Sequence, residues 1–379
     1  MRYHYDIGYN NNVLSIICHV VYATIGFNLE KPTMKLKIVV LSLCLLSLAA
    51  TAFTGENRPV VTLMTHDSFS ADKALLERFE NQHGVTLRIL KIGDAGAALN
   101  QAILSKNNPL ADVFYGVDNT FMSRALKADI FIPYASPYLE NIPDHLKLDS
   151  QNRLLPVDFG DVCLNYDKKW FIEKGMQPPH GLEDLLKPEF KSLTVVQNPA
   201  TSSPGMAFLL ATVGRFGSDG HLKFWKALRE NDVYVTSGWS EAYYGQFTRA
   251  KGGTRPIVVS YASSPPAEVY YSETKLDDSP TAAVLSPLST FRQIEFVGIL
   301  KGTRQQDLAA RLVDFLLGPD FQKGIPLNMW VFPADASVPL PEIFKKYTKI
   351  AETPVLLTPQ AIEIGREKWL EAWMETVLR

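Results

Sequence analysis

Short apolar runs alternate with amphipathic stretches along the first third of the chain. The apolar runs are rich in β-branched residues, have the length of strands, and lie at residues 58–66, 85–92 and 111–118. The amphipathic stretches place apolar side chains at helical spacing and lie at residues 70–84, 94–105 and 121–126. Ser70 is expected to cap the first helix, and Gly84 to end it. This order predicts a βαβαβ unit, in which a parallel sheet carries helices on its faces.

Each of these predicted strands is followed by an aspartate, namely Asp67, Asp94 and Asp118. The carboxyl ends of parallel strands meet at one edge of a sheet, where the ligands of α/β proteins bind. Three carboxylates at that edge predict a polar site that prefers a positively charged ligand. Because aspartate is also a common helix cap after a strand, each one taken alone is equally well explained by capping.

The rest of the chain again alternates predicted strands with predicted helices. Strands are expected at residues 192–199, 255–265 and 291–302, and helices at 201–217, 221–231, 305–319 and 358–379. In the last helix, Trp369 and Trp373 lie four residues apart on one face. The series predicts an α/β protein of two lobes, each a mainly parallel sheet flanked by helices, joined by hinge crossings. Lobe 1 is expected to contain residues 58–158 and 291–379, and lobe 2 residues 159–290.

The most hydrophobic stretch of the chain predicts an export signal. Lys35 and Lys37 precede an apolar run at residues 38–48, and small residues then follow in an A-x-A pattern. We therefore interpret residues 34–52 as a secretory signal peptide, whose apolar core is too short to span a bilayer. Residues 1–33 precede a methionine that already begins a complete signal, so we interpret them as an extension that results from too early a start.

The predicted signal places the mature protein in the bacterial periplasm, and no second apolar run of membrane-spanning length follows it. Cys163 is the single cysteine after the signal, so neither an internal disulfide nor a thiol metal site is expected. With 38 Lys and Arg against 40 Asp and Glu, the net charge is −2, and no basic field for nucleic acid is expected. The sequence lacks a G-x-S-x-G elbow, a P-loop, an H-E-x-x-H motif and a Cys/His cluster, so it does not indicate catalysis.

A polar segment at residues 198–205 (NPATSSPG) follows a predicted strand and opens an apolar helix. Ser203 fits the N-cap position, and Pro204 fits the first helical turn. A helix N-terminus with free N–H groups suits a phosphate, and the hydroxyls of Thr201, Ser202 and Ser203 add donors. An ordinary capped helix is the simpler explanation of this segment taken alone.

Aromatic side chains gather in two polar, turn-forming segments, rather than in the apolar runs where core aromatics usually lie. These residues are Trp239, Tyr243, Tyr244, Tyr261, Tyr270 and Tyr271, and Trp330 is similarly placed beside a turn. Such rings predict stacking on a flat or cationic ligand. The alternative is that they pack between the lobes.

Seven segments carry a resemblance to a known family. They are THDSFSAD (65–72), ADVFYGVDNTFMSRA (111–125), PVDFGDVCLNYDK (156–168), NPATSSPG (198–205), GWSEAYYGQF (238–247), VVSYASSP (258–265) and FLLGPDFQKGIPLNMWVFP (315–333). From about residue 59 to its end, the chain resembles the thiamine-binding periplasmic proteins of ABC transporters, within the type II periplasmic binding proteins. The resemblance implies a monomer without catalysis or cofactor. Such a protein captures thiamine, thiamine phosphate or thiamine diphosphate between two α/β lobes and delivers it to a membrane permease and its ATPase.

The resemblance also assigns contacts to the ligand. The residues at the corresponding positions are Asp94 and Ala95 in the first lobe, Ser202 and Ser203 on the phosphate side, and Trp239 and Tyr261 at the rings, followed by Ala262, Ser263 and Ser264. Asp67 or Asp94 suits the cationic thiazolium, and Trp330 is expected at the same site. His66 departs from the family, in which a tyrosine is common at this position.

Two other functions stay open. The first is ferric iron binding, because iron-binding relatives use adjacent tyrosines as ligands, and this chain pairs Tyr243 with Tyr244 and Tyr270 with Tyr271. The second is an enzyme on the same fold that makes or degrades the thiamine pyrimidine. Such an enzyme needs an activated nucleophile, and Cys163 is the only candidate thiol. Its apolar surroundings favour a buried structural role instead.

Overall fold

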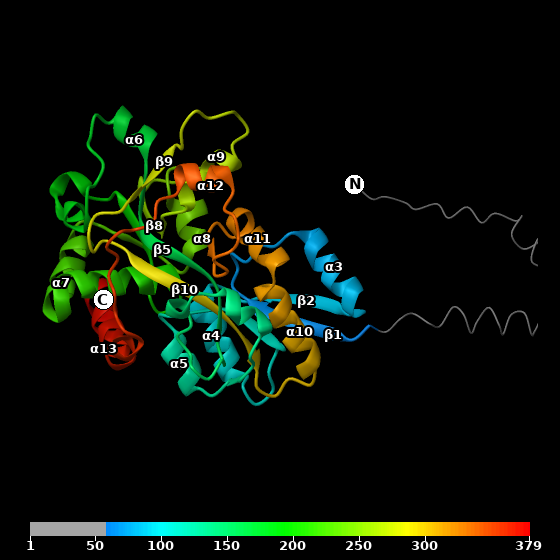
Figure 1. Ribbon diagram of the computed structural model, residues 1–379. Coiled ribbons are helices and arrows are strands. Elements are labelled where there is room, and N and C mark those ends of the chain that lie inside the picture. The colour runs from blue at the N-terminus through cyan, green and yellow to red at the C-terminus, as the bar shows by residue number, and fades with distance from the viewer. Residues whose placement is uncertain (1–57) are drawn as a thin grey trace, which may run out of the picture. The chain divides into compact units, whose positions relative to one another are not determined.

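Residues 58–379 of the computed structural model contain one mixed sheet of eleven strands with helices packed around it (Figure 1). These are the residues that the structure describes. The predicted extension (1–33) and signal peptide (34–52) lie outside them. Within residues 58–379, no helix is both long and apolar enough to cross a membrane.

The strands follow one another across the sheet in an order different from their order in the chain. They are β1 (Val60–Thr65), β2 (Thr86–Lys91), β3 (Val113–Asp118), β4 (Phe131–Ile132), β5 (Leu155–Asp167), β6 (Thr194–Gln197), β7 (Tyr234–Thr236), β8 (Ile257–Tyr261), β9 (Thr281–Val284), β10 (Phe291–Leu300) and β11 (Phe332–Pro333). The main path of the sheet is β2-β1-β3-β10-β5-β8-β6-β7. Off this path, β4 pairs with β10, and β9 and β11 pair with β5.

Helices connect most of these strands. The α-helices are α3 (Lys73–His83), α4 (Ala95–Leu104), α5 (Met122–Lys127), α6 (Lys168–Glu173), α7 (Ser203–Glu230), α8 (Trp239–Glu241), α9 (Ser264–Tyr270), α10 (Gln306–Leu317), α11 (Pro319–Asn328), α12 (Glu342–Tyr347) and α13 (Pro359–Val377). The short 3₁₀ turns are η1 (Pro137–Asn141), η2 (Asp144–Leu146), η3 (Leu182–Leu186) and η4 (Pro188–Phe190). A π-helical turn, η5 (Ala242–Gln246), directly continues α8.

The first three strands confirm the predicted βαβαβ start, because β1 pairs in parallel with both β2 and β3. The cap of α3 is Asp72 rather than the predicted Ser70. The carboxylate of Asp72 accepts hydrogen bonds from the N–H groups of Ala74 and Leu75. The helix ends as predicted at Gly84, whose φ of 62° lies in the left-handed region.

β5 and β10 run antiparallel through the middle of the sheet and connect its two parallel parts (Figure 1). The first half of β5 pairs with β10, and its second half pairs with β8 and β9. Along its other edge, β10 pairs with β3. The sheet therefore consists of two parallel groups, β2-β1-β3 and β8-β6-β7, joined by two crossing strands. The lobe boundaries predicted at residues 158, 159, 290 and 291 stay a prediction.

α7 unites the two helices that the sequence predicts in this region. The run is interrupted at Gly217, whose φ of 74° and ψ of 179° suit glycine alone. At its start, the cap is Ser202 and not Ser203. Ser202 has an extended backbone, and its hydroxyl oxygen lies 3.5 Å from the N–H nitrogen of Gly205, from which it accepts a hydrogen bond. Ser203 is already helical, so its hydroxyl is available for another partner.

The C-terminal helix α13 packs against both α7 and α5. Trp373 is fully buried, with its ring edge-on to that of Trp225 at a centroid distance of 5.5 Å and an interplanar angle of 86°. Trp369 is partly buried against the same core. The face predicted from the spacing of these two tryptophans is therefore the face that docks.

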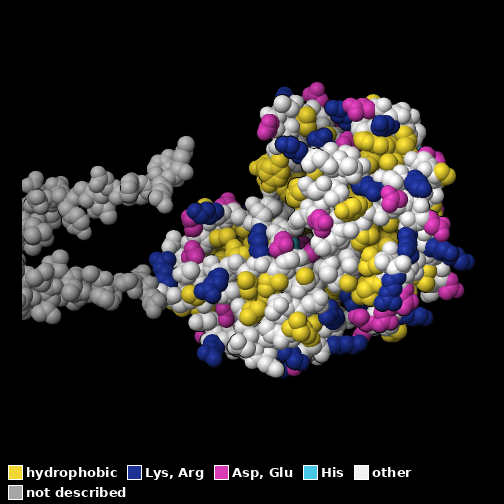
Figure 2. Space-filling view, turned by 180° about the vertical axis from the view of Figure 1, so that it is seen from behind, with side chains coloured by type: hydrophobic (Ala, Val, Ile, Leu, Met, Phe, Trp, Pro, Cys, Tyr) yellow, Lys and Arg dark blue, Asp and Glu magenta, His cyan; other side chains and the backbone are white. Residues whose placement is uncertain are grey.

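Side chains of both charges are interspersed on the surface. On the face of residues 58–379 drawn in Figure 2, Lys and Arg side chains lie beside Asp and Glu, with apolar side chains between them. This mixture is the surface counterpart of the small net charge of the chain, −2.

Candidate ligand-binding site

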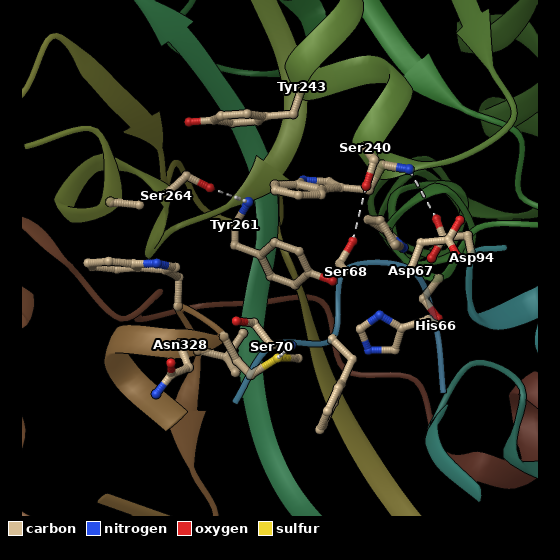
Figure 3. A pocket seen from close by; sticks show the side chains of 18 of the residues that line it. His66, Asp67, Ser68, Ser70, Asp94, Ser240, Tyr243, Tyr261, Ser264 and Asn328 are labelled. Atoms are coloured by element: carbon tan, nitrogen blue, oxygen red, sulfur yellow. Dashed lines mark hydrogen bonds between the residues drawn. The ribbon is translucent and has the colours of Figure 1, made fainter. Parts of the chain in front are cut away.

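A cavity of about 350 Å³ lies at the ends of β1, β2 and β8, over the middle of β10 (Figure 3). The start of α7, the segment formed by α8 and η5, and residues 328–331 complete its lining. The edge beyond the carboxyl ends of parallel strands is where the sequence predicts a ligand. The volume of the cavity is in the range of cavities that enclose small organic molecules.

Seven of the eleven predicted site residues line this cavity, namely Asp67, Asp94, Ser203, Trp239, Tyr261, Ser264 and Trp330. The other four are buried outside the lining, namely Ala95, Ser202, Ala262 and Ser263. Further polar or charged residues of the lining that the prediction did not include are His66, Ser68, Ser70, Lys91, Ser240, Glu295 and Asn328. Most of the predicted site residues therefore lie together at one cavity, and their contacts with a ligand stay a prediction.

Two of the four residues outside the lining support the wall from behind. Ser202 is fully buried, and its hydroxyl accepts the N–H of Gly205, so Ser202 shapes the start of α7. The hydroxyl of Ser263 donates to the carbonyl oxygen of Trp330 at 2.5 Å. This bond holds the backbone that carries the Trp330 indole. Neither serine lines the cavity, and the direct ligand contact expected of them stays a prediction.

Asp94 combines the two roles that the sequence left open for it. Its Oδ1 accepts the N–H of Ala95 at 2.9 Å and so caps α4, while its Oδ2 accepts the N–H of Trp239 at 3.1 Å. Close by, the hydroxyl oxygens of Ser68 and Ser240 are 3.3 Å apart (Figure 3). These contacts join the first βα units to the segment that follows β7, and they close the cavity on this side.

Asp118 lies beneath the cavity instead of in its lining. It is fully buried and accepts hydrogen bonds from the hydroxyl of Ser203 and, at 2.6 Å, from the N–H of Thr120. Burial raises the pKa of Asp118 to about 6, although the hydrogen bonds from Ser203 and Thr120 lower it. The hydroxyl that the sequence assigned to a phosphate is therefore already bonded to a carboxyl group.

The first aromatic group of the lining is built around Trp239. Its indole stacks on the ring of Tyr243 at 5.0 Å and 23°, and the ring of Tyr244 lies edge-on to it at 5.3 Å. The indole N–H donates to the hydroxyl of Ser260 at 2.9 Å. These contacts fix the plane of the indole, so that the ring is preorganised for a flat ligand.

The second aromatic group is built around Trp330. The ring of Tyr271 lies 5.6 Å from it at an angle of 68°, and both residues line the cavity. Tyr270 touches Trp330 at 5.3 Å but lies outside the lining. Tyr261, at the end of β8, donates its hydroxyl to the side-chain oxygen of Gln293 at 3.2 Å. Most of these aromatic rings therefore face the cavity, and the alternative, packing between the lobes, stays a prediction.

His66, Tyr115, Asp158 and Glu295, which we name the floor cluster, bring titratable groups together at the base of the cavity. Glu295 of β10 is directly paired with Asp158 of β5, and the Nε2 of His66 lies 3.5 Å from Oε1 of Glu295. Tyr115 of β3 donates its hydroxyl to Asp158. His66 and Glu295 line the cavity, while Tyr115 and Asp158 are completely buried. The available signal in the sequence was a carboxylate inside each of two largely apolar strands, namely Asp158, with Asp161 close to it, in β5 and Glu295 in β10.

Burial and proximity set the protonation of the floor cluster. Burial raises the pKa of Asp158 well above its usual range, and the adjacent Glu295 carboxylate raises it further. For His66, burial lowers the pKa, but the nearby carboxylates of Glu295 and Asp94 more than offset this, so that the pKa is raised above 6.5. Glu295 thus lies beside an imidazole that accepts a proton readily.

Gly116 of β3 makes room for His66. Its φ of 110° lies in the left-handed region, and a Cβ at this position would lie 2.6 Å from Cδ2 of His66. The position of the imidazole at the base of the cavity depends on this absence of a side chain.

The two alternative chemistries find little support at this site. Within the described residues, no three or more His, Cys, Asp or Glu side chains are grouped to hold a metal ion. Tyr243 donates its hydroxyl to Glu268 at 2.8 Å, and burial raises its pKa well above the usual range, so it is a poor source of phenolate. Cys163 is fully buried, which raises its pKa and leaves it without nucleophilic activation.

The fold and the cavity are those of a solute-binding protein. The family described as bacterial extracellular solute-binding protein matches residues 108–350, which is more than half of the chain, and the chain belongs to this family. The thiamine-binding periplasmic protein of Escherichia coli (strain K12) is 32% identical over 327 residues, which are 85% of this chain and 94% of that protein.

Solved structures place the fold within the same class. A periplasmic thiamin binding protein matches with a TM-score of 0.75 at 28% identity, covering 86% of this chain and 98% of that one. The ferric binding protein from Campylobacter jejuni matches with a TM-score of 0.65 at 19% identity, covering 83% and 99%, which shows a shared fold alone. These relatives are binding proteins and not enzymes, and the predicted type II periplasmic binding protein fold is confirmed.

Proposed function

We propose that this protein captures thiamine in the periplasm, with its phosphate esters as further ligands, and delivers it to the permease and ATPase of an ABC importer. The observation that carries the proposal is a cavity in which three carboxylates, Asp67, Asp94 and Glu295, lie among aromatic rings. The similarity to thiamine-binding relatives over most of the chain supports the same ligand.

The chemistry of thiamine matches this lining. Its thiazolium ring carries a permanent positive charge, and its aminopyrimidine ring is flat and apolar on both faces. An aromatic ring attracts a cation by about 0.5–2 kcal/mol, depending on how dry the site is. Trp239 and Trp330 offer such rings, and the carboxylates supply a counter-charge that is strengthened where water is excluded.

The phosphate esters need an additional contact, for which the start of α7 is the candidate. A helix N-terminus offers free N–H groups and partial positive charge, and Ser203 and Pro204 bring this end of α7 to the cavity. Lys91 also lines the cavity. Its Nζ donates to the carbonyl oxygens of Asp67 at 3.1 Å and Phe69 at 2.6 Å. This ammonium group supports an anionic tail.

We propose that binding is the whole of the activity, with no cofactor and no turnover. A ligand between Trp239 and Glu295 would stabilise the contacts that already join Asp94 to Trp239 and Ser68 to Ser240. The bound shape is then what the permease reads. Export of a monomer through the signal predicted at residues 34–52 completes the proposal.

The proposal is tested by titrating the purified protein with thiamine and following tryptophan fluorescence and heat. One ligand per chain and a change in fluorescence are expected, because Trp239 and Trp330 line the cavity. The free aminopyrimidine alcohol, which lacks the thiazolium, serves as the matched ligand and should bind more weakly. Native mass spectrometry of the freshly purified protein detects any retained ligand. Absence of thiamine binding, together with a visible charge-transfer band on addition of ferric citrate, would favour the iron-binding alternative instead.

A further inference from the structure

Glu295 and His66 are the members of the floor cluster that reach the cavity, and their mutual contact is loose. Nε2 of His66 is buried and has no hydrogen-bond partner in the part of the chain that the structure describes. It lies 3.5 Å from Oε1 of Glu295, and the two side chains are 7% and 9% exposed. The same oxygen of Glu295 is 3.4 Å from Nε2 of Gln293, a long hydrogen bond. The carboxylate therefore lies at the cavity surface with unused capacity to accept.

Every element around His66 contributes to its electrostatic surroundings. The first βα units supply Asp67, which follows His66 directly, Lys91 of β2 and Asp94 before α4. The central strands supply Tyr115 of β3, whose ring centroid lies 6.1 Å from that of His66, Asp158 of β5, which is bonded to Tyr115, and Glu295 of β10. Tyr261 of β8 completes these titratable or charged groups. Glu295 and Asp94 favour the imidazolium, whereas Lys91 opposes it. Glu295 has the strongest influence of these partners, so the charge on His66 follows what happens at Glu295.

A ligand cation and an imidazolium compete for the same carboxylate. Two positive charges a few ångströms apart repel strongly where water is excluded. Asp158 cannot serve as a second counter-charge for the ligand, because it is fully buried outside the cavity lining, and burial and the neighbouring Glu295 raise its pKa well above the usual range. When thiamine occupies the cavity, only one of the two cations can be balanced by Glu295.

We propose that Glu295 is the specificity-determining carboxylate for the ligand cation, and that the ligand displaces the proton that His66 carries beside Glu295. The inference rests on the proposed function in taking thiamine as the cation. The proton leaves Nε2 of the imidazolium for solvent, and the thiazolium takes its place as the counter-charge of Glu295. His66, where a tyrosine is common in the family that the sequence resembles, makes the affinity of this protein depend on pH.

The direction of the pH dependence follows from the linkage between thiamine binding and proton binding at His66. Below the pKa of His66 in the empty protein, binding must expel a proton, so affinity is reduced. As pH rises towards that pKa the affinity increases, at the steepest by roughly tenfold per pH unit, and it becomes level once His66 is neutral before binding. The reciprocal effect is a fall in the pKa of His66 when thiamine binds.

The experiment is calorimetric titration of the full protein with thiamine from pH 5.5 to pH 8, in two buffers with different heats of ionisation at each pH. The wild type is expected to release a proton and to bind more tightly as pH rises. His66→Gln should remove this release, because glutamine stays neutral. Glu295→Gln should weaken thiamine at pH 7.5 and also remove the release. The aminopyrimidine of thiamine titrates by itself in the acid range, but it contributes equally to wild type and variants, so their difference is the measure.

His145→Gln is the matched control, because His145 is exposed and lies outside the cavity lining. It should keep the wild-type profile. Should either variant fail to fold, NMR titration of the His66 ring in the wild type gives the same answer, since thiamine must lower its pKa. A proton release or a pH dependence of affinity that is the same in wild type and His66→Gln, or a His66 pKa that thiamine leaves unchanged, would overturn the inference and leave thiamine binding intact. Thiamine that fails to bind the wild type at any pH would overturn both.

Discussion

The base and the walls of the cavity are built in different ways. The base is carried by neighbouring strands of one sheet, and the exposed fractions of the His66 and Glu295 side chains there are below 10%. The walls are carried by the short α8, by η5, by the end of α9 and by the turn at residues 328–331. Tyr244 in η5 and Tyr271 at the end of α9 are 67% and 65% exposed. A sheet holds a charge at a fixed place with little water, whereas short helices present broad rings. The base therefore decides which charge is accepted, and the walls supply the contact area.

The largest effect is expected at Asp118, whose carboxyl group is buried below the cavity. Because its pKa is raised to about 6 from 3.8, the folded state binds a proton more tightly than the unfolded state does. The free energy of unfolding should therefore fall as pH rises from about 4 to about 7, by up to about 3 kcal/mol. Asp118→Asn stays neutral and should lack this contribution. Urea denaturation of wild type and variant at pH 4.5 and pH 7.5 measures it, and equal pH dependence in both proteins would contradict it.

Removal of the main aromatic wall is the next largest change. Trp239→Ala deletes an indole that stacks on Tyr243 and lines the cavity, so thiamine binding should weaken by about 1–3 kcal/mol. Calorimetry at pH 7.5 measures the loss, and about 1–3 kcal/mol corresponds to an affinity lowered roughly 5- to 150-fold. Trp170→Ala, which removes an indole outside the lining, is the matched control and should bind thiamine as the wild type does. An unchanged affinity in Trp239→Ala would remove this residue from the site.

Two aspartates that the sequence treated alike should differ. Asp94→Asn removes the charge that accepts the N–H of Trp239 at 3.1 Å, so thiamine should bind about fivefold more weakly, or about 1 kcal/mol. Asp67→Asn should cost less, because Asp67 is exposed and its charge is screened by water and salt. Titration of both variants with thiamine at low and at high salt separates the two effects. The smaller effect, that of Asp67→Asn, should disappear first as salt is added. Equal losses would show that the cation is not held near Asp94.

The smallest effect is expected at the start of α7. Ser203→Ala removes a hydroxyl that lines the cavity but is already bonded to Asp118, so only a two- to threefold loss, roughly 0.5 kcal/mol, is expected for thiamine diphosphate. Thiamine itself should lose less. Ser202→Ala is the informative neighbour, because it removes the helix cap without altering the lining, and it should lower stability rather than discriminate between the ligands. An equal loss for both ligands in Ser203→Ala would contradict a phosphate role.

Local patterns sufficed for the strand ends and not for the base of the cavity. Asp67 and Asp94 could be predicted because parallel strands bring their carboxyl ends to one edge whatever the details of packing. Glu295 and Asp158 could not, because their proximity depends on the pairing of β5 with β10 between segments far apart in the chain. A carboxylate in an apolar run marks an unusual position, but it does not identify its partner.

The helix start of α7 shows a subtler limit of the sequence. Ser202 and Ser203 are adjacent and chemically identical, and each satisfies the rules for a cap. The tertiary structure determines which serine caps the helix, because Asp118 accepts the hydroxyl of Ser203 and leaves Ser202 to cap the helix. Ser203 therefore lines the cavity, whereas Ser202, one residue earlier, lies behind the lining.

Gly116 and His66 differ in how freely they can be changed. A methyl group at residue 116 would lie 2.6 Å from the imidazole of His66, and the φ of 110° strains any side chain at this position whatever occupies residue 66. Residue 66 can therefore change while the glycine stays, whereas a change of residue 116 meets both the collision and the strain. A selection library aimed at the base of the cavity should vary residue 66 and keep the glycine.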